Sequence, residues 1–268
     1  MKAWKLYLLS SFLILTSCEE VIEVDLEESE PRLVVEASII WLKGSTGNQQ
    51  SIRLSKTSPF YQEEVEPVLN AEVNIYSANG REFNFSHSGN GVYISNTFEP
   101  ILNQDYYLEL TYNDQLYTAT ERMMPVTDID YVEQSNSGGF TGDDIEIKAY
   151  YTDPADQENY YLFKFLTDDL SLEFYEDEFT NGNQIFGYYS DEDLEKGDEI
   201  DIFMEGISRD YFEYLFILRS QVGNNGGGPF ETMPATVKGN VINQSNREDY
   251  PFGYFRLSQA DSTSYIIE

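Results

Sequence analysis

Short runs of alternating apolar residues, separated by glycine and asparagine turns, recur along most of this chain and restrict it to β structure. Val73 and Ile75 alternate with polar neighbours, as do Phe83 and Phe85. Successive side chains of a strand point to opposite faces, so the alternation predicts strands with one buried face. Because the runs are short and end in turns such as Asn113-Asp114, we expect an immunoglobulin-like β-sandwich.

The predicted fold is mainly β, in two units. A first sandwich occupies residues 32–126 and ends at Met124-Pro125, because proline interrupts a strand. A second β-rich unit follows over 127–268. Its strands are expected at 159–166, 199–204, 253–258 and 264–267, with long loops at 168–198 and 223–229. One helix is predicted at about 210–222, where Asp210 and Glu213 form a capping box before the apolar stripe of Tyr211, Leu215, Leu218 and Val222.

The N-terminus has the pattern of a bacterial lipoprotein signal. A basic start is followed by apolar residues from Leu6 to Leu15 and then by Leu-Thr-Ser-Cys, which predicts export, removal of residues 1–17 and lipid on Cys18. The apolar run is about half of the roughly 20 residues that a membrane-spanning helix needs. Residues 18–31 are rich in acids and form a predicted tether. Since Cys18 is the only cysteine, the chain offers no disulfide or zinc–thiolate site.

The charge balance excludes one class of partner. Removal of Lys2 and Lys5 with the signal reduces the 16 basic residues to 14, against 48 acidic ones. Such a chain repels phosphate backbones and anionic lipid surfaces, so nucleic acid is not an expected partner and the lipid must hold the protein at its membrane. The acidity could attract Ca²⁺ or a basic partner, or serve solubility in a saline habitat.

The sequence does not show the residue pattern of a hydrolase triad. His87 is the only histidine, no Gly-x-Ser-x-Gly elbow occurs, and His87 alternates with Phe83 and Phe85 as an ordinary residue at the end of a strand. Glycosidases need only two carboxylates, and 48 acids always supply a suitable pair. A non-enzyme is therefore predicted, with a carboxylate-based glycan-active enzyme as the alternative.

Two acidic segments resemble calcium loops. A loop beginning at Asp191 would have Lys196 and Ile202 where an EF-hand needs glycine and glutamate. Asp153, Asp156 and Glu158 could form another kind of Ca²⁺ site, although runs of acids are usually solvated faces. No cofactor other than the lipid is predicted.

Four pairs of adjacent tyrosines offer candidate contacts. In a strand, one member of each pair faces the core and the other faces outward. Outward tyrosines suit contact with protein or carbohydrate, unless a neighbouring unit or loop covers them. The candidate contact residues are Tyr107, Tyr150, Tyr161 and Tyr188.

Several ordered segments resemble one family, the Bacteroidota outer-membrane lipoproteins catalogued as domain of unknown function 4249. The segments span nearly the whole mature chain and are Cys18–Leu26, Pro31–Glu36, Ala71–Ile75, Gly91–Tyr93, Tyr106–Leu110, Tyr117–Ala119, Asp153-Pro154, Asn159–Tyr161, Gly228–Phe230, Lys238–Asn243 and Gly253–Phe255.

The resemblance implies a location and a partner. Glu19 and Glu20 after the lipidated cysteine resemble a signal for export to the cell surface, which would place the protein on the outer membrane. Such proteins are often encoded beside TonB-dependent transporters, so an outer-membrane β-barrel protein is the implied partner. The first unit is also similar to transthyretin-like sandwiches attached to such transporters. Open alternatives are ligand capture, a structural subunit of an assembly or secretion machine, and a Ca²⁺-dependent adhesin.

Overall fold

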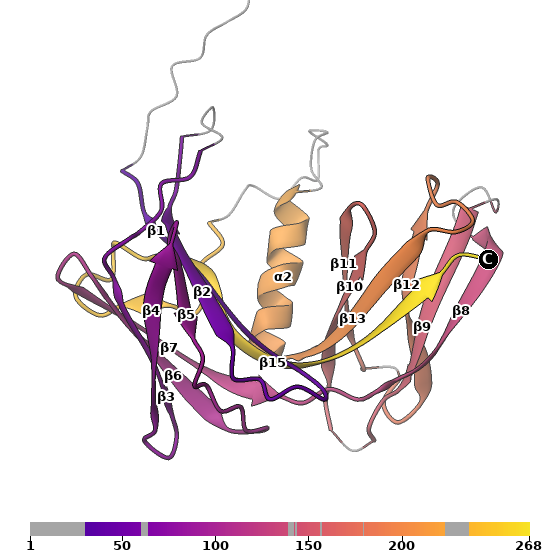
Figure 1. Ribbon diagram of the computed structural model, residues 1–268, viewed down its shortest axis with the longest axis horizontal. Coiled ribbons are helices and arrows are strands. Elements are labelled where there is room, and N and C mark those ends of the chain that lie inside the picture. The colour runs from indigo at the N-terminus through magenta and orange to yellow at the C-terminus, as the bar shows by residue number, and fades with distance from the viewer. Residues whose placement is uncertain are drawn as a thin grey trace, which may run out of the picture. The chain divides into compact units, whose positions relative to one another are not determined.

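The fold is mainly β, as predicted. The structure, a computed structural model, describes residues 30–59, 64–138, 142, 144–155, 157–178, 180–222 and 236–268. The signal, Cys18, the tether up to residue 29, Asp156 and the 223–229 loop lie outside the described residues. The strands are β1 Leu33–Leu42, β2 Gln50–Lys56, β3 Glu72–Ser77, β4 Glu82–Gly89, β5 Val92–Ser95, β6 Asp105–Tyr112, β7 Gln115–Met124, β8 Ile129–Gly138, β9 Asp144–Thr152, β10 Tyr160–Leu166, β11 Leu170–Glu176, β12 Gln184–Asp191, β13 Glu199–Ile207, β14 Ile242–Asn243 and β15 Phe252–Ile266 (Figure 1).

Eight strands of the first part close into a ring. Their order is β15-β1-β2-β5-β4-β3-β6-β7, and β7 returns to β15 through the pairs Met123–Leu257 and Met124–Ser258. The predicted alternation is clear in β1, where Val35, Ala37 and Ile39 are fully buried while Glu36 and Ser38 are exposed, and in β6. The sandwich-like description thus fits, with the two layers joined at both edges.

The predicted turn at Asn113-Asp114 joins β6 to β7. Both residues have positive φ values, 50° and 59°. This geometry is that of a type I′ turn, whose twist matches the twist of an antiparallel hairpin, and asparagine and aspartate tolerate it. Tyr112 and Gln115 pair directly across it.

A second layered unit follows. Strands β12, β9 and β8 form a separate three-stranded sheet. Its inner side chains, including Ile147, Ala149 and Tyr151, share a core with Phe163 of β10 and Ile202 of β13. Gly187 permits this packing, because a Cβ atom there would lie 2.6 Å from the Phe163 ring.

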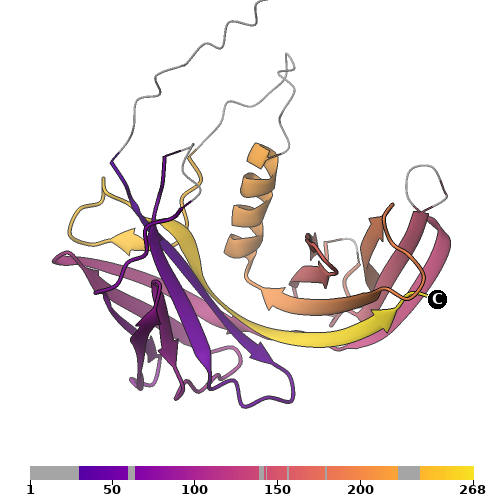
Figure 2. The same cartoon turned by 45° about the horizontal axis from the view of Figure 1, so that its top comes forward.

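The C-terminal strand belongs to both cores. β15 is a single 15-residue strand where two short ones were predicted, and Figure 2 shows it as one continuous ribbon. Residues 252–260 pair in parallel with β1, and residues 260–266 pair antiparallel with β13. Val241, Phe255 and Leu257 pack in the first core. A division at residue 126 therefore does not separate the cores, and residues 31–268 form one compact unit.

Helix α2, Arg209–Val222, is the only helix among the described residues. The predicted capping residue was wrong. Ser208 caps the helix, because its Oγ atom accepts a bond of 3.3 Å from the Tyr211 amide and its carbonyl accepts one of 3.0 Å from Phe212. The prediction of a long loop at 168–198 is also wrong, because this segment contains strands β11 and β12. In the described part of the chain, no helix has the length and apolar character to cross a membrane.

Candidate functional site

Each tyrosine pair places one ring inside and one outside. The inner members are Tyr106, Tyr151, Tyr161 and Tyr189, all buried. Among the predicted contact residues, Tyr107 is 42% exposed, and Tyr150 and Tyr188 are partly exposed. Their positions leave them available for contact.

Tyr161 is the exception, because it is only 2% exposed and its neighbour Tyr160 faces outward instead. Its hydroxyl donates a hydrogen bond of 2.6 Å to Oδ1 of Asp153. Burial, together with this bond, raises the pKa of Tyr161. The interpretation of Tyr161 as a surface contact was therefore wrong.

Of the predicted calcium residues, the structure describes Asp153 and Glu158, which belong to no metal-holding group of described side chains. Asp153 is buried, and its second oxygen accepts a bond of 3.1 Å from the Gly182 amide, so its carboxylate serves internal hydrogen bonds. Glu158 is exposed, 3.5 Å from the Tyr160 hydroxyl. Among the described residues, no group of three or more histidine, cysteine or acidic side chains could hold a metal ion.

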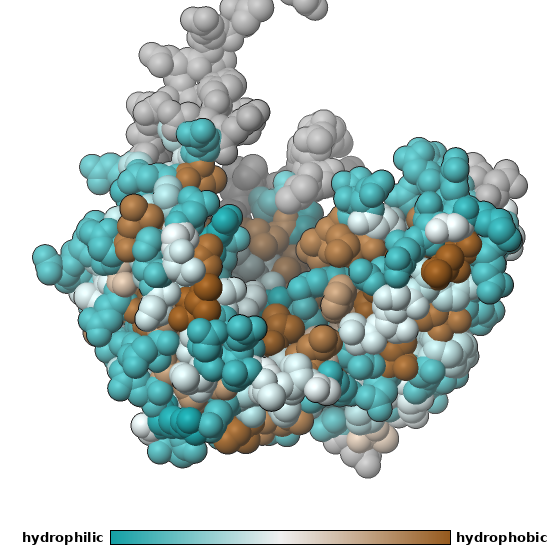
Figure 3. Space-filling view, viewed as in Figure 1, coloured by the Kyte–Doolittle hydropathy of each residue, from teal (hydrophilic) through white to brown (hydrophobic). Residues whose placement is uncertain are grey.

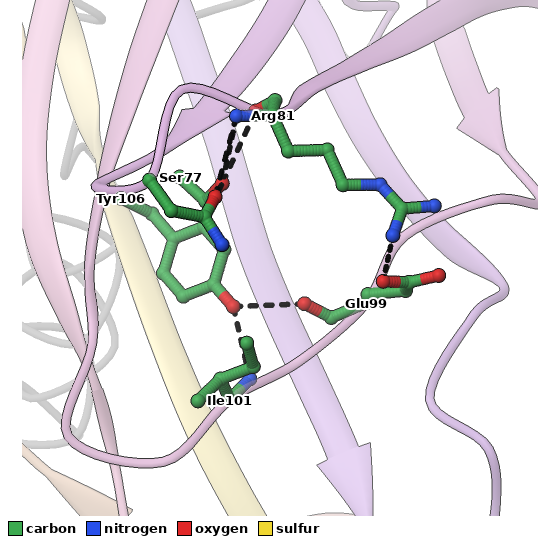
Figure 4. A network of polar contacts seen from close by, with 6 residues as sticks. Ser77, Arg81, Glu99, Ile101 and Tyr106 are labelled. Atoms are coloured by element: carbon green, nitrogen blue, oxygen red, sulfur yellow. Dashed lines mark hydrogen bonds and ion pairs between the residues drawn. The ribbon is translucent and has the colours of Figure 1, made fainter.

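Tyr106 illustrates how the inner ring of a pair fixes the outer one (Figure 4). Its hydroxyl donates to the Glu99 carbonyl at 2.8 Å and accepts from the Ile101 amide at 2.9 Å, while Arg81 forms an ion pair with Glu99. Burial raises the pKa of Tyr106. Tyr107 is consequently held outward on a well-anchored strand.

The outward rings gather most closely on the three-stranded sheet. Strand register places Tyr131 of β8 beside Tyr150 of β9, and Tyr150 beside Phe186 of β12. The Tyr131 and Tyr150 ring centroids lie 4.6 Å apart at 15°, and the Tyr150 and Phe186 centroids lie 5.2 Å apart at 59°. We call these three residues the aromatic ridge. Sequence reasoning missed Tyr131 and Phe186, since only the register of the sheet shows that they neighbour Tyr150.

Charged side chains border the aromatic ridge. Lys148 lies 5.0 Å from the Phe186 ring centroid, and it forms an ion pair with Glu146 that raises the pKa of Lys148. Burial, and then Glu133, raise the pKa of Tyr150. Tyr131 and Tyr150 stack on each other, so one face of each ring is covered, and Tyr131 is 46% exposed. This suits contact with a protein surface better than stacking on a sugar.

A second exposed apolar group lies on α2 and β11. Phe216 and Ile217 of the helix and Leu170 and Leu172 of the strand are exposed, and Figure 3 shows apolar surface in this region. Arg219 attaches the helix to this edge strand. Its guanidinium donates a hydrogen bond of 2.5 Å to the Leu172 carbonyl and one of 3.1 Å to the Glu173 carboxylate. An edge carbonyl that would otherwise be open to pairing is thereby covered.

The features expected of a carboxylate enzyme lie in different places. A cavity of about 470 Å³ in the second unit has acidic walls that include Asp168, Asp191 and Asp198. Glu121, the carboxyl group whose pKa burial raises, is not among its lining residues. His87 is exposed, and its ring lies 5.2 Å from the Tyr93 ring.

Glu121 gives a testable pH dependence. It accepts hydrogen bonds of 2.9 Å from the Arg122 amide and 3.0 Å from the Ser208 hydroxyl, yet burial, with a contribution from Asp210, still raises its pKa. A raised pKa means that folding favours the protonated form. The contribution of Glu121 to stability is thus complete below its unfolded pKa and is lost as the pH rises through its folded pKa.

We therefore expect the melting temperature of Glu121→Gln, measured relative to that of the natural chain, to rise as the pH increases from 4 to 8. The rise should be about 2–4 °C for each kcal/mol of stability that the natural chain loses. Thermal unfolding followed by circular dichroism at each pH measures this. Glu109→Gln, at an exposed position on β6, is the control and should show no such slope. A slope of the opposite sign for Glu121→Gln would contradict the assignment.

Comparison with known proteins gives a family and only weak structural similarity. A cytokine receptor complex matches with 9% identity over 67% of this chain and 86% of that chain, at a TM-score of 0.26. A DUF4785 family protein from Legionella pneumophila matches with 10% identity over 65% of this chain and 51% of that chain, at a TM-score of 0.27. The chicken interferon gamma receptor alpha chain matches with 10% identity over 66% of this chain and 88% of that chain, at a TM-score of 0.19.

No curated protein matches the sequence. The family model described as a domain of unknown function, DUF4249, matches residues 19–264, and the chain therefore belongs to this family.

Proposed function

We propose that this chain is a non-catalytic binding or accessory subunit, held on the outer membrane by lipid on Cys18 and exposed on the cell surface. The lipoprotein pattern at residues 1–18 and the acidic residues after it support the anchor. The protein docks on an outer-membrane β-barrel protein, such as a TonB-dependent transporter.

The aromatic ridge is the observation that carries the docking role. Three rings from three strands stand side by side on one sheet face, with Lys148 and Glu146 at their border. Tyrosine rings on a rigid sheet lose little entropy on binding, and aromatic residues dominate the affinity of protein interfaces. An apolar centre with a charged border is the usual arrangement of such a contact.

The experiment is a mild-detergent extraction of the tagged, full-length lipoprotein from its own membranes, followed by mass spectrometry. We expect a stoichiometric barrel protein to co-purify. The double variant Tyr131→Ala/Tyr150→Ala should reduce its recovery by about 30-fold or more, since truncating an interface anchor costs about 2 kcal/mol or more. Recovery of the lipoprotein alone would contradict the proposal.

Two controls separate docking from folding and anchoring. Tyr107→Ala removes an exposed tyrosine outside the ridge and should leave the recovery of the barrel protein unchanged; a loss with this variant alone would move the contact to β6. Cys18→Ser should release the protein from the membrane fraction without changing its unfolding. Melting curves confirm that every variant is folded.

A further inference from the structure

A second candidate binding site lies in the first unit, on the outer face of the β1–β2 pair. A cavity of about 500 Å³ opens there. Its floor is made by two cross-strand pairs, Val34 opposite Ser55 and Glu36 opposite Arg53. Val65, Pro67 and Asn90 line it as well. We call it the strand pocket.

The walls of the strand pocket are fixed by hydrogen bonds. The Val68 amide donates a hydrogen bond of 3.0 Å to the Leu54 carbonyl. The buried Tyr93 hydroxyl donates one of 3.0 Å to the Val68 carbonyl. Asn90, with φ of 48°, stands at a turn where Gly91 approaches the Leu54 carbonyl so closely that any Cβ atom would clash. A cavity formed in advance loses little entropy when a ligand binds.

Some polar groups of the strand pocket have partners, as Lys56 and Thr57 do, whereas three have none among the described residues. Nine cations of the described chain form ion pairs, and Arg53 is one of the five that form none there. Glu36 likewise has neither an ion pair nor a side-chain hydrogen bond to a described residue, and the same holds for the hydroxyl of Ser55. In a chain with three times as many acids as bases, an exposed arginine that lines a cavity and has no ion pair to a described residue is a group available to a ligand.

The charges of the strand pocket balance locally. Arg53 offsets Glu36, and Lys56 is neutralised by Glu66 at 2.7 Å. A strongly anionic ligand would meet Glu36 and the negative field of the whole chain, and a cation would meet Arg53. The balance therefore favours an uncharged ligand.

Sugar hydroxyls match the remaining chemistry. Each hydroxyl both donates and accepts, and the strand pocket offers a donor in Arg53 directly opposite an acceptor in Glu36, with Ser55 able to do either. Val34, Val65 and Pro67 supply aliphatic surface for the C–H faces of a ring. We propose that the strand pocket binds a neutral polyhydroxylated ligand, a mono- or disaccharide unit of a glycan. This proposal does not depend on the docking role of the aromatic ridge.

The test is saturation-transfer NMR on the full-length lipoprotein in a detergent without a sugar headgroup. The probes are maltose, cellobiose, lactose and N,N′-diacetylchitobiose, with glucuronate and glucosamine as charged comparators. We expect at least one disaccharide to bind with a Kd of about 1 mM or below. Glucuronate and glucosamine should bind at least about tenfold more weakly, a difference of about 1.4 kcal/mol.

Variants assign the binding to the strand pocket. Arg53→Met should weaken disaccharide binding at least about tenfold, and Ser55→Ala should weaken it less. Arg247→Met makes the same change at an exposed arginine that has no ion pair to the described residues, and should have no effect. Unchanged melting temperatures show that these variants remain folded.

Three results would overturn the proposal. The first is the absence of saturation transfer from all four disaccharides. The second is binding that persists in Arg53→Met, which would place the sugar elsewhere. The third is tighter binding of glucuronate than of the neutral sugars, which would make the strand pocket an anion site. None of these results bears on co-purification of the barrel partner, so the two proposals fail separately.

Discussion

Replacing Arg256 with methionine is expected to lower the free energy of unfolding by about 3–5 kcal/mol, because it leaves a buried carboxylate without its buried cationic partner. Glu205 of β13 is 2% exposed and Arg256 of β15 is 5% exposed, and their side chains approach to 2.6 Å. Lys164 of β10 contacts the other oxygen of Glu205 at 2.5 Å. Ser38 and Ser258 accept further bonds from Arg256, at 3.0 and 3.1 Å.

The effect depends on pH with a definite sign. Burial by itself would raise the pKa of Glu205, but the charges of Arg256 and Lys164 outweigh it and hold the pKa below its usual value. A lowered pKa means that the stabilisation is present above the unfolded pKa and is lost as the pH falls through the folded pKa. The cost of Arg256→Met should therefore be larger at pH 7 than at pH 4, as urea unfolding at both values will show.

Two further variants separate the buried pair from the general effect of a core mutation. Lys164→Met should cost less, because Lys164 is 26% exposed and water can reach the site on its side. The double variant Arg256→Met/Glu205→Leu should recover most of the lost stability, since apolar replacement of a buried pair is often neutral. A double variant as unstable as Arg256→Met would contradict this account.

The sequence predicts this fold where local rules decide the structure. Tyr106 and Tyr107 separate to opposite faces because the strand period is two. The Asn113-Asp114 turn follows from residues that tolerate positive φ. Helix α2 was placed within one residue at its start, although its cap was not, because Ser208 and Asp210 are both good capping residues.

Local rules failed where polar residues are buried by distant partners. Residues 259–263 are mostly polar and were predicted to separate two strands, yet Gln259 is buried within the single strand β15, as is Ser258 just before it. Ser258 is satisfied by Arg256, and Gln259 by the amide of Val126, at 3.3 Å. Such partners depend on register between segments far apart in the chain, and one sequence does not contain that register. For the same reason the sequence predicts only Tyr150 of the aromatic ridge and not Tyr131 or Phe186.

Replacing Gly253 with alanine is expected to be the most damaging small change, with a loss of at least about 3 kcal/mol from a total stability of about 5–15 kcal/mol. Gly253 has a φ of +90° at the start of β15, and a Cβ atom there would clash with the Val35 carbonyl of β1. The carbonyl of Gly253 in turn lies where a Cβ atom on Gly239 would be.

This close crossing brings together two separate segments of the sequence, Lys238–Asn243 and Gly253–Phe255. Because neither glycine has a side chain, the side chain of Asn240 reaches the backbone of Phe255. Its Nδ2 atom donates a hydrogen bond of 2.7 Å to the Phe255 carbonyl, and its Oδ1 atom accepts one of 2.9 Å from the Phe255 amide. The Asn240 side chain thus stands in for a neighbouring strand. Any Cβ atom at Gly253 would push β15 from β1 and from Asn240 together.

Gly80→Ala is the matched control, because Gly80 has nearly the same backbone conformation, with φ of +82°, but nothing within 4 Å of the added Cβ atom. It should cost only the strain of the left-handed conformation, about 1–2 kcal/mol. Urea unfolding of both variants measures the difference. If Gly253→Ala and Gly80→Ala lose the same stability, the close crossing makes no contribution and the β1–β15 pairing tolerates displacement; a larger loss for Gly253→Ala assigns the excess to the crowded backbone.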